Sequence, residues 1–209
     1  MLIVLDSENR HRYPALFEEM LAARHDIFVE KYRWADLRSE GGLEYDQFDH
    51  PDTIYFLEVN NSGEILGGCR LLKTEGQHTV LTTELGKAVP GLIARPLPSF
   101  GASVADLSRF FVREKQEHVG FISKTSADLL SGVARYCNRS RITTLLAVID
   151  IKFASKLIQC GWSVKPLGLP QRYERGWMLA VQIEVSEWTA DTIQLAARPK
   201  PPKLPAYHG

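Results

Sequence analysis

The amino-acid sequence predicts one α/β domain. Two observations support this fold class. β-rich segments alternate with segments of helical spacing, and 44% of the 209 residues are apolar while 24% are charged. A chain of this length buries enough surface for one core. We expect the domain to span residues 1–197, and residues 198–209, which include four prolines, to form an extended tail.

The first half of the chain predicts a strand, a helix and a hairpin. The apolar residues 2–5 suit a short strand, and residues 13–28 carry apolar side chains at helical spacing. Two β-rich segments, 53–59 and 65–72, flank the turn sequence Asn60-Asn61-Ser62-Gly63. Turn residues between two such segments are typical of a β-hairpin.

The second half alternates strands with helices after a proline-containing loop at 91–101. The expected elements are a strand at 104–112, a helix at 122–137, a strand at 143–149, a helix at 153–158 and a strand at 177–185. Gly161 predicts the end of the second helix, because glycine adopts the left-handed conformation that terminates helices.

Composition argues against several classes of function. Twenty-five Lys and Arg balance twenty-five Asp and Glu, whereas nucleic-acid binders are normally basic. The longest apolar runs, five residues, are far shorter than the ~20 that a membrane helix needs, and no basic stretch precedes the first of them as in a signal peptide. Cys69, Cys137 and Cys160 lack metal-binding spacing, so we expect buried thiols in a reducing cytoplasm and no metal site.

The charges are unevenly distributed along the chain. Residues 36–64 carry a net charge of minus seven, and residues 109–141 a net charge of plus four. The two segments are either faces for a cationic and an anionic ligand or simply two solvated surfaces.

The most informative stretch of sequence lies between residues 24 and 49. Arg24 and Phe28 are one helical turn apart, and Trp34 follows. Glu44, Asp46 and Asp49 are three acids within six residues. Their charges would repel one another unless a bound cation or nearby arginines neutralised them.

These residues resemble the motifs of the LuxI-type acyl-homoserine-lactone synthases, bacterial enzymes that make quorum-sensing signals. The matching positions are the N-terminal triplet Arg24, Phe28 and Trp34, the acidic trio Glu44, Asp46 and Asp49, the central Arg70, and Ser108-Arg109-Phe110 in the later strand. Where the family usually carries Trp-Glu, this chain has Ala105-Asp106.

The resemblance implies an acetyltransferase-like three-layer α/β/α sandwich, whose mixed central sheet splays to admit the pantetheine arm of an acyl thioester. It also implies a two-step reaction. The amine of S-adenosylmethionine attacks the thioester, and its carboxylate then closes the lactone and releases methylthioadenosine. No prosthetic group is implied. The donor is acyl-coenzyme A or acyl carrier protein, and we expect a monomer or weak dimer.

The resemblance further implies roles for individual residues. Glu44 and Asp106 are alternative general bases, with Arg109 and the hydrogen-bonding Ser108 beside them. S-adenosylmethionine would contact Arg24, Phe28, Trp34, Asp46, Asp49 and Arg70. An internal salt-bridge network of Asp46, Asp49 and Arg70 is an equally good interpretation, because buried charges must be paired.

The acyl donor should meet apolar and basic residues of the second half. Candidates are Phe110, Leu129, Leu146 and Val148 for the chain, and a basic face of Lys124, Arg135, Arg139 and Arg141 for the carrier. The centre of strand 145–149 has no hydroxyl, which in this family favours an unsubstituted, branched or aryl chain.

Two other functions fit the same fold. One is a coenzyme A-dependent N-acetyltransferase, but its pyrophosphate loop is glycine-rich, and the equivalent stretch 113–120 has only Gly120. The other is a non-catalytic acyl-binding module, for which Trp34 would be dispensable.

Overall fold

A computed structural model describes residues 1–34, 37, 39–75, 79–82, 89, 91–113, 122–173 and 176–198 of the chain. The predicted tail beyond Arg198 and residues 114–120 of the acetyltransferase-type loop lie outside the described residues.

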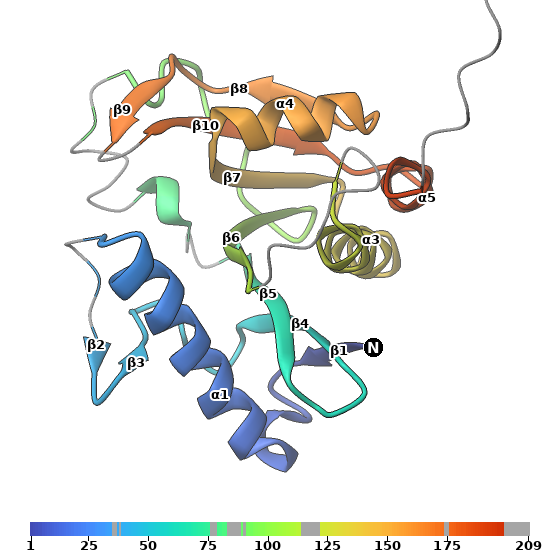
Figure 1. Ribbon diagram of the computed structural model, residues 1–209. Helices are drawn as coiled ribbons and strands as arrows, with labels where there is room; N and C mark the ends of the chain where they lie inside the picture. Colours follow the sequence, from blue (N-terminus) through green and yellow to red (C-terminus); the bar gives the residue numbers. More distant parts are fainter. Residues whose placement is uncertain are drawn as a thin grey trace, which may run out of the picture.

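The core of the molecule is one sheet of eight strands (Figure 1). Their order is β1-β4-β5-β6-β7-β10-β8, and β9 pairs with β10. The strands are β1 (Leu2–Leu5), β4 (Ile54–Val59), β5 (Ile65–Lys73), β6 (Val104–Val112), β7 (Thr144–Asp150), β8 (Ser163–Pro166), β9 (Gln171–Tyr173) and β10 (Gly176–Glu184). A separate pair, β2 (Ser39–Glu40) and β3 (Leu43–Glu44), precedes β4.

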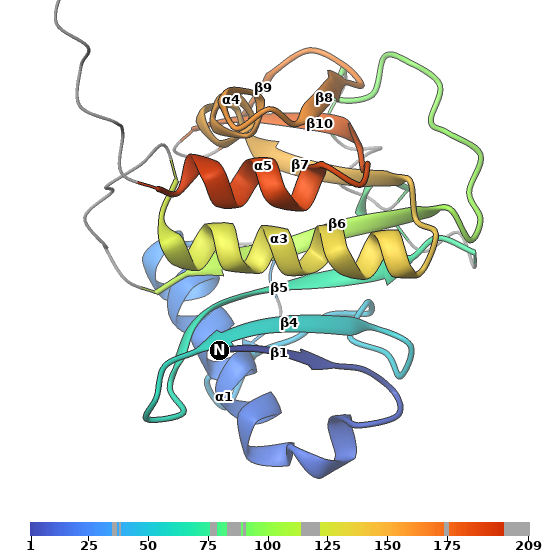
Figure 2. The same cartoon turned by 90° about the vertical axis from the view of Figure 1, so that its right-hand side faces the viewer.

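Helices cover both faces of this sheet. The buried side chains of α3 (Lys124–Arg139), α4 (Ile151–Gln159) and α5 (Thr189–Ala196) form one apolar cluster with one face. Those of α1 (Pro14–Arg24) form another with the opposite face. Figure 2 shows α3 and α5 in front of the sheet with α1 behind it. The three-layer α/β sandwich is therefore confirmed.

Local sequence explains where these helices begin. Pro14 is the first residue of α1, a position where its missing N–H costs no helical bond. Ser123 and Asp150 cap α3 and α4, each accepting a hydrogen bond from a backbone N–H of the first turn. Gly161 follows α4 with a φ of +85°, as its helix-stop signal predicts.

Several elements differ from the sequence prediction. The first helix is α-helical only to Arg24 and continues as a π-helix, η2 (His25–Lys31). The short elements β2, β3, β8, β9 and α5 were not predicted. Two- to four-residue strands carry too little periodicity to detect, and α5 buries only Thr189, Ala190 and Ile193.

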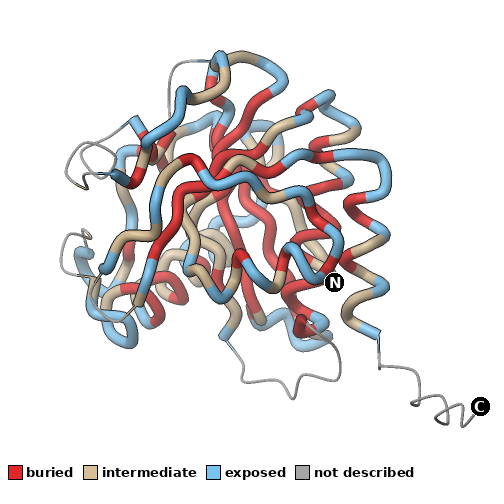
Figure 3. Tube along the Cα trace, turned by 90° about the horizontal axis from the view of Figure 1, so that it is seen from above, coloured by how far each residue is buried: buried red, intermediate tan, exposed pale blue. Residues whose placement is uncertain are grey.

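The sheet opens at its centre. β6 and β7 are parallel, and they pair only from Val104 opposite Thr144 to Asp106 opposite Leu146. All the other strand pairs of this sheet are antiparallel. Because β6 continues six residues beyond Asp106, the two strands separate there, and the sheet is mixed and splayed as expected. Figure 3 shows the buried residues concentrated in the middle of the molecule, with the exposed ones around them.

Candidate active site

Six charged side chains form a closed ring of ion pairs on the α1 side of the sheet. Following the ring, Arg24 pairs with Glu44, Glu44 with Arg109, Arg109 with Asp46, Asp46 with Arg70, Arg70 with Asp49, and Asp49 with Arg24. The six closest N···O distances lie between 2.6 and 3.1 Å. Each acid bridges two arginines, so three negative charges balance three positive ones.

The ring is buried, and its members hold one another charged. Burial alone would lower the pKa of Arg24, but hydrogen bonds and charges from Asp49 and Glu44 raise it above its ordinary value. Burial would raise the pKa of Asp49, yet Arg24 and Arg70 hold it well below its usual range. Tyr55 donates its hydroxyl proton to Asp49 over 2.9 Å and adds a neutral partner.

A β-bulge brings Arg109 into the ring. The register between β5 and β6 shifts between Gly68 and Arg70, and Arg109 adopts a φ of +52°, which non-glycine residues rarely do. Consecutive strand residues normally face opposite sides of a sheet. Here Ser108 accepts a hydrogen bond from Arg70 Nε at 3.2 Å while Arg109 binds Glu44 and Asp46. Both therefore reach the same site.

An aromatic cluster adjoins the ring. Phe28 of η2 packs against Trp34 with ring centroids 5.0 Å apart, and the Arg109 guanidinium carbon lies 5.7 Å from the Phe28 centroid. Tyr173 of β9 meets Trp34 edge to face at 6.2 Å. The cluster thus joins the N-terminal segment to a strand from the far half of the sheet. Arg24 and Phe28 face one site, as their spacing predicts.

Asp106 differs from the ring acids because none of the described arginines forms an ion pair with it. Its Oδ2 accepts hydrogen bonds from Thr79 Oγ1 at 2.5 Å and from Val80 N at 3.0 Å. Its Oδ1 is buried, and it has no hydrogen-bond partner within the described part of the chain. Burial raises the pKa of Asp106 from 3.8 to about 6, although Thr79, Val80, Arg70 and Arg109 each act to lower it.

This geometry separates the two candidate bases. Both Glu44 oxygens accept hydrogen bonds from guanidinium groups, Oε2 from Arg24 Nε at 2.6 Å and Oε1 from Arg109 Nη2 at 2.9 Å. Asp106 keeps one oxygen without such a bond and lies at the last β6–β7 pair before the strands separate. A base needs an oxygen able to take a proton, so the geometry favours Asp106 over Glu44.

The four candidate acyl-chain residues divide between the two faces of the sheet. Leu129 and Phe110 pack in the cluster under α3 and α4, where Phe110 lies 5.1 Å from Phe153. Leu146 and Val148 pack on the opposite face. The backbone N–H of Arg113, the residue after β6, donates to the carbonyl of Leu66 at 2.8 Å.

The predicted basic face is dispersed. Lys124 pairs with Asp128, and Arg135 with Asp191. Arg139 ends α3. Arg141 lies two residues before Thr143, whose N–H binds the Ser103 carbonyl just before β6. Arg139 and Arg141 are exposed, but they lie beside the paired ends of β6 and β7. The structure does not bring them to the opening where a donor would enter.

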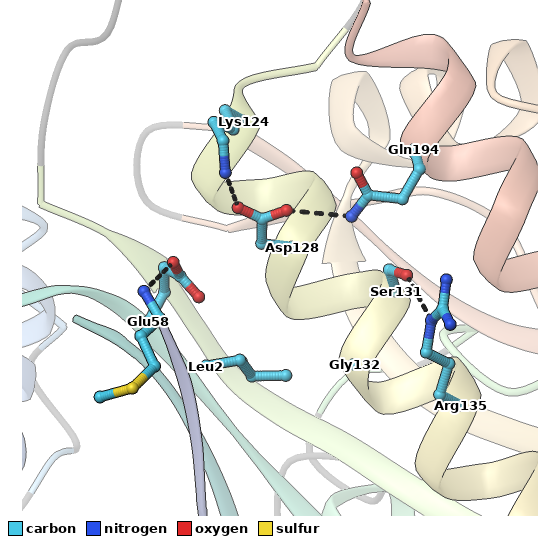
Figure 4. A pocket seen from close by; sticks show the side chains of 9 residues that line it. Leu2, Glu58, Lys124, Asp128, Ser131, Gly132, Arg135 and Gln194 are labelled. Atoms are coloured by element: carbon cyan, nitrogen blue, oxygen red, sulfur yellow. Dashed lines mark hydrogen bonds and ion pairs between the residues drawn. The ribbon is translucent and has the colours of Figure 1, made fainter. Parts of the chain in front are cut away.

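A cavity of about 340 Å³ lies at the start of α3, away from the ring (Figure 4). Its lining carries both signs of charge, and Figure 4 shows Lys124 and Gln194 both directed at Asp128, while Arg135 donates to Ser131. No member of the ring and no residue of the aromatic cluster lines it. These internal pairs do not favour a donor site there.

Sequence reasoning missed three residues that touch this site. Tyr55 reaches the ring from β4, Tyr173 reaches Trp34 from β9, and Thr79 holds Asp106. The β-rich segment 53–59 predicted a strand that contains Tyr55, but nothing in the sequence indicated which residues would meet Asp49 or Trp34. These contacts depend on segments distant in sequence.

Comparison with known proteins identifies the family. A model of the autoinducer synthase family matches residues 8–193. The chain belongs to the autoinducer synthase family. This confirms the resemblance and, with it, the expected acyltransferase activity of an acyl-homoserine-lactone synthase. The N-acetyltransferase and the non-catalytic binding module are set aside.

Similar proteins cover nearly the whole chain of this autoinducer synthase. It is 29% identical to the isovaleryl-homoserine lactone synthase of Bradyrhizobium diazoefficiens over 195 residues, 92% of this chain and 84% of that protein. The structure of BjaI, a CoA-dependent acyl-homoserine lactone synthase with SAM and isopentyl-CoA, aligns with a TM-score of 0.79 at 28% identity, covering 98% of this chain and 95% of BjaI. The CoA-dependent acyl-homoserine lactone synthase MesI aligns with a TM-score of 0.79 at 25% identity, covering 94% and 95%.

The described residues of the synthase contain neither a candidate metal site nor a candidate membrane-spanning helix. No group of three or more His, Cys, Asp or Glu side chains among them is arranged to hold a metal ion. None of their helices combines the length and apolar character that crossing a membrane requires.

Proposed function

We propose that this synthase acylates S-adenosylmethionine from an acyl-coenzyme A and then closes the lactone, releasing methylthioadenosine. The observation that carries the proposal is the placement of Asp106 at the point where β6 and β7 separate, with one carboxylate oxygen that has no hydrogen-bond partner among the described residues. Arg70 and Arg109 of the charged ring act on Asp106, and the aromatic cluster adjoins the ring at Arg109.

S-adenosylmethionine brings an adenine, a sulfonium, an ammonium and a carboxylate. Phe28, Trp34 and Tyr173 offer faces and edges for the adenine or the sulfonium, and a cation over such a ring gains about 0.5–2 kcal/mol. Within the ring, Asp46 and Arg109 are the most exposed members, with 13% and 10% of their side chains accessible. We assign the substrate ammonium to Asp46 and its carboxylate to Arg109.

The acylation step requires a neutral amine. Asp106 Oδ1 takes one proton from the ammonium, directly or through a water, and the amine then attacks the thioester carbonyl. The C–N bond forms as the C–S bond breaks and coenzyme A leaves as the thiol. In the second step a carboxylate oxygen attacks the γ-carbon, and the C–S bond to the sulfonium breaks to give methylthioadenosine. This step needs positioning more than proton transfer.

The donor enters where the sheet opens. Beyond Asp106, β6 has no pairing with β7, so its backbone N–H groups on that edge are available for the oxyanion of the thioester carbonyl. We propose coenzyme A as the carrier because the CoA-dependent BjaI and MesI resemble this chain over most of its length. Acyl carrier protein is the alternative outcome. A branched acyl group fits the isovaleryl product of the Bradyrhizobium relative and the absence of a hydroxyl at Leu146 and Val148.

Two further expectations belong to this proposal. Cys69, Cys137 and Cys160 are free and buried, which suits a reducing compartment, so we place the enzyme in the cytoplasm. We also retain a monomer or weak dimer that works without a prosthetic group.

A turnover assay tests the proposal. S-adenosylmethionine is supplied with a panel of acyl-coenzyme A and acyl-carrier-protein donors, and mass spectrometry follows acyl-homoserine lactone and methylthioadenosine together. We expect equal amounts of the two products with a branched short-chain acyl-coenzyme A. Turnover with carrier-protein donors alone would overturn the choice of coenzyme A, and methylthioadenosine formed without the lactone would overturn the two-step reaction.

A further inference from the structure

Thr79 directly precedes the short 3₁₀ helix η3 (Val80–Thr82), which packs against the centre of the sheet. The Thr79 side chain is fully buried, and its hydroxyl makes two hydrogen bonds. Oγ1 accepts the backbone N–H of Leu81 at 3.2 Å and lies 2.5 Å from Asp106 Oδ2.

These two contacts fix the direction of the Thr79 hydroxyl. The N–H of Leu81 occupies one lone pair of Oγ1, and an ionised Asp106 can only accept, so the Thr79 hydroxyl proton points to Asp106 Oδ2. Asp106 Oδ2 accepts this proton and the N–H of Val80 at 3.0 Å. A carboxylate oxygen offers two lone-pair sites, so both sites of Oδ2 are filled. Only Oδ1 is left to bind a proton.

We infer that Thr79 is a positioning residue for the reaction, which orients the Asp106 carboxylate so that Oδ1 is the oxygen that exchanges the proton with the substrate amine. The inference rests on the proposed function, in which Asp106 is the general base. Thr79 itself contacts no reacting atom. It acts by occupying Oδ2 and by stabilising the ionised form of Asp106.

The surroundings of Asp106 make this role measurable. The charged groups that act on it are Arg70 of β5 and Arg109 of β6, and the β7 residue opposite it is the apolar Leu146. Replacing Thr79 by Val keeps the shape of the side chain and leaves both arginines in place. The substitution removes one bond that lowers the Asp106 pKa, so the pKa rises further above its ordinary value.

The test compares Thr79→Val with Thr79→Ser, which keeps the hydroxyl. The pH dependence of kcat/KM for S-adenosylmethionine is recorded between pH 5 and 9. With Thr79→Val the acidic limb should move upward by about half to one pH unit, the equivalent of one hydrogen bond, and kcat at neutral pH should fall. Thr79→Ser should keep the wild-type limb, and thermal unfolding of each variant establishes that it is folded.

The variant Asp106→Asn separates the positioning role of Thr79 from the role of Asp106 as the general base. If Asp106→Asn loses turnover but Thr79→Val keeps the wild-type limb, the positioning role of Thr79 is wrong and the base assignment stands. If Asp106→Asn turns over like the wild type, the base assignment fails, and the inference falls with it. A shifted limb in Thr79→Val and an unshifted one in Thr79→Ser supports both.

Discussion

Neutralising Glu44 tests whether the ion-pair ring stabilises the fold. Glu44→Gln keeps the volume of the side chain but removes one of the three negative charges. Glu44 is fully buried and accepts bonds from Arg24 and Arg109, and Arg24 is only 1% exposed. The glutamine oxygen can still accept from one guanidinium. Its NH₂ group then faces the other guanidinium, so that two hydrogen-bond donors oppose each other.

The expected loss follows from this burial. Removing one partner of a buried ion pair costs about 3–5 kcal/mol, because the remaining charge stays out of water without compensation. Domains of this size unfold with about 5–15 kcal/mol, so the loss is a large share of the total. At about 2–4 °C per kcal/mol, the unfolding temperature should fall by about 6–20 °C.

Calorimetry and urea unfolding measure this loss, with Glu18→Gln on the exposed side of α1 as the matched control. The double variant Glu44→Gln with Arg109→Gln restores a neutral set of charges, so it should lose less than the sum of the two single variants. A loss below about 1 kcal/mol for Glu44→Gln, equal to that of Glu18→Gln, would refute the stabilising role of the ring.

Three further predictions concern the base, the aromatic cluster and the donor. As the pH falls from 8 to 4, the unfolding free energy of the wild type should rise by about 2 kcal/mol relative to that of Asp106→Asn. The reason is that Asp106 has a pKa of about 6 in the folded chain against an ordinary 3.8, so the folded chain binds the proton first. A difference between the two proteins that does not change with pH would contradict the raised pKa. Trp34→Ala should raise KM for S-adenosylmethionine by about 3–30-fold, the equivalent of one lost aromatic contact, whereas exposed Trp188→Ala should not change it. Reversing Arg139 and Arg141 to Glu should leave KM for the acyl donor within about twofold in steady-state kinetics, since both lie at the paired ends of the central strands. A several-fold rise would restore them as donor contacts.

Much of the fold could be predicted because its strands and helices carry clear periodicity. Residues 104–112 were expected to form a strand, and β6 is found at those residues. The π-helix after Arg24 could not be predicted, because the apolar spacing that predicts a helix to residue 28 does not distinguish an α-helical turn from a π-helical one. Thr79 gave no signal either, since its role depends on a contact with Asp106, 27 residues away in sequence.

The sequence left two interpretations of its charged motif open, substrate binding or an internal salt-bridge network. The structure shows the network, and its members differ in how exposed their side chains are. Arg24, Glu44 and Arg70 are almost completely inaccessible, and each is already paired with opposite charges of the ring, so we assign them to the scaffold. Asp46 and Arg109 form one edge, 2.8 Å apart, with the highest exposure in the ring. A substrate that carries both an ammonium and a carboxylate can replace their mutual bond with one bond to each. Asp46 and Arg109 then each keep a partner of opposite charge, and the scaffold can therefore remain neutral as the substrate binds.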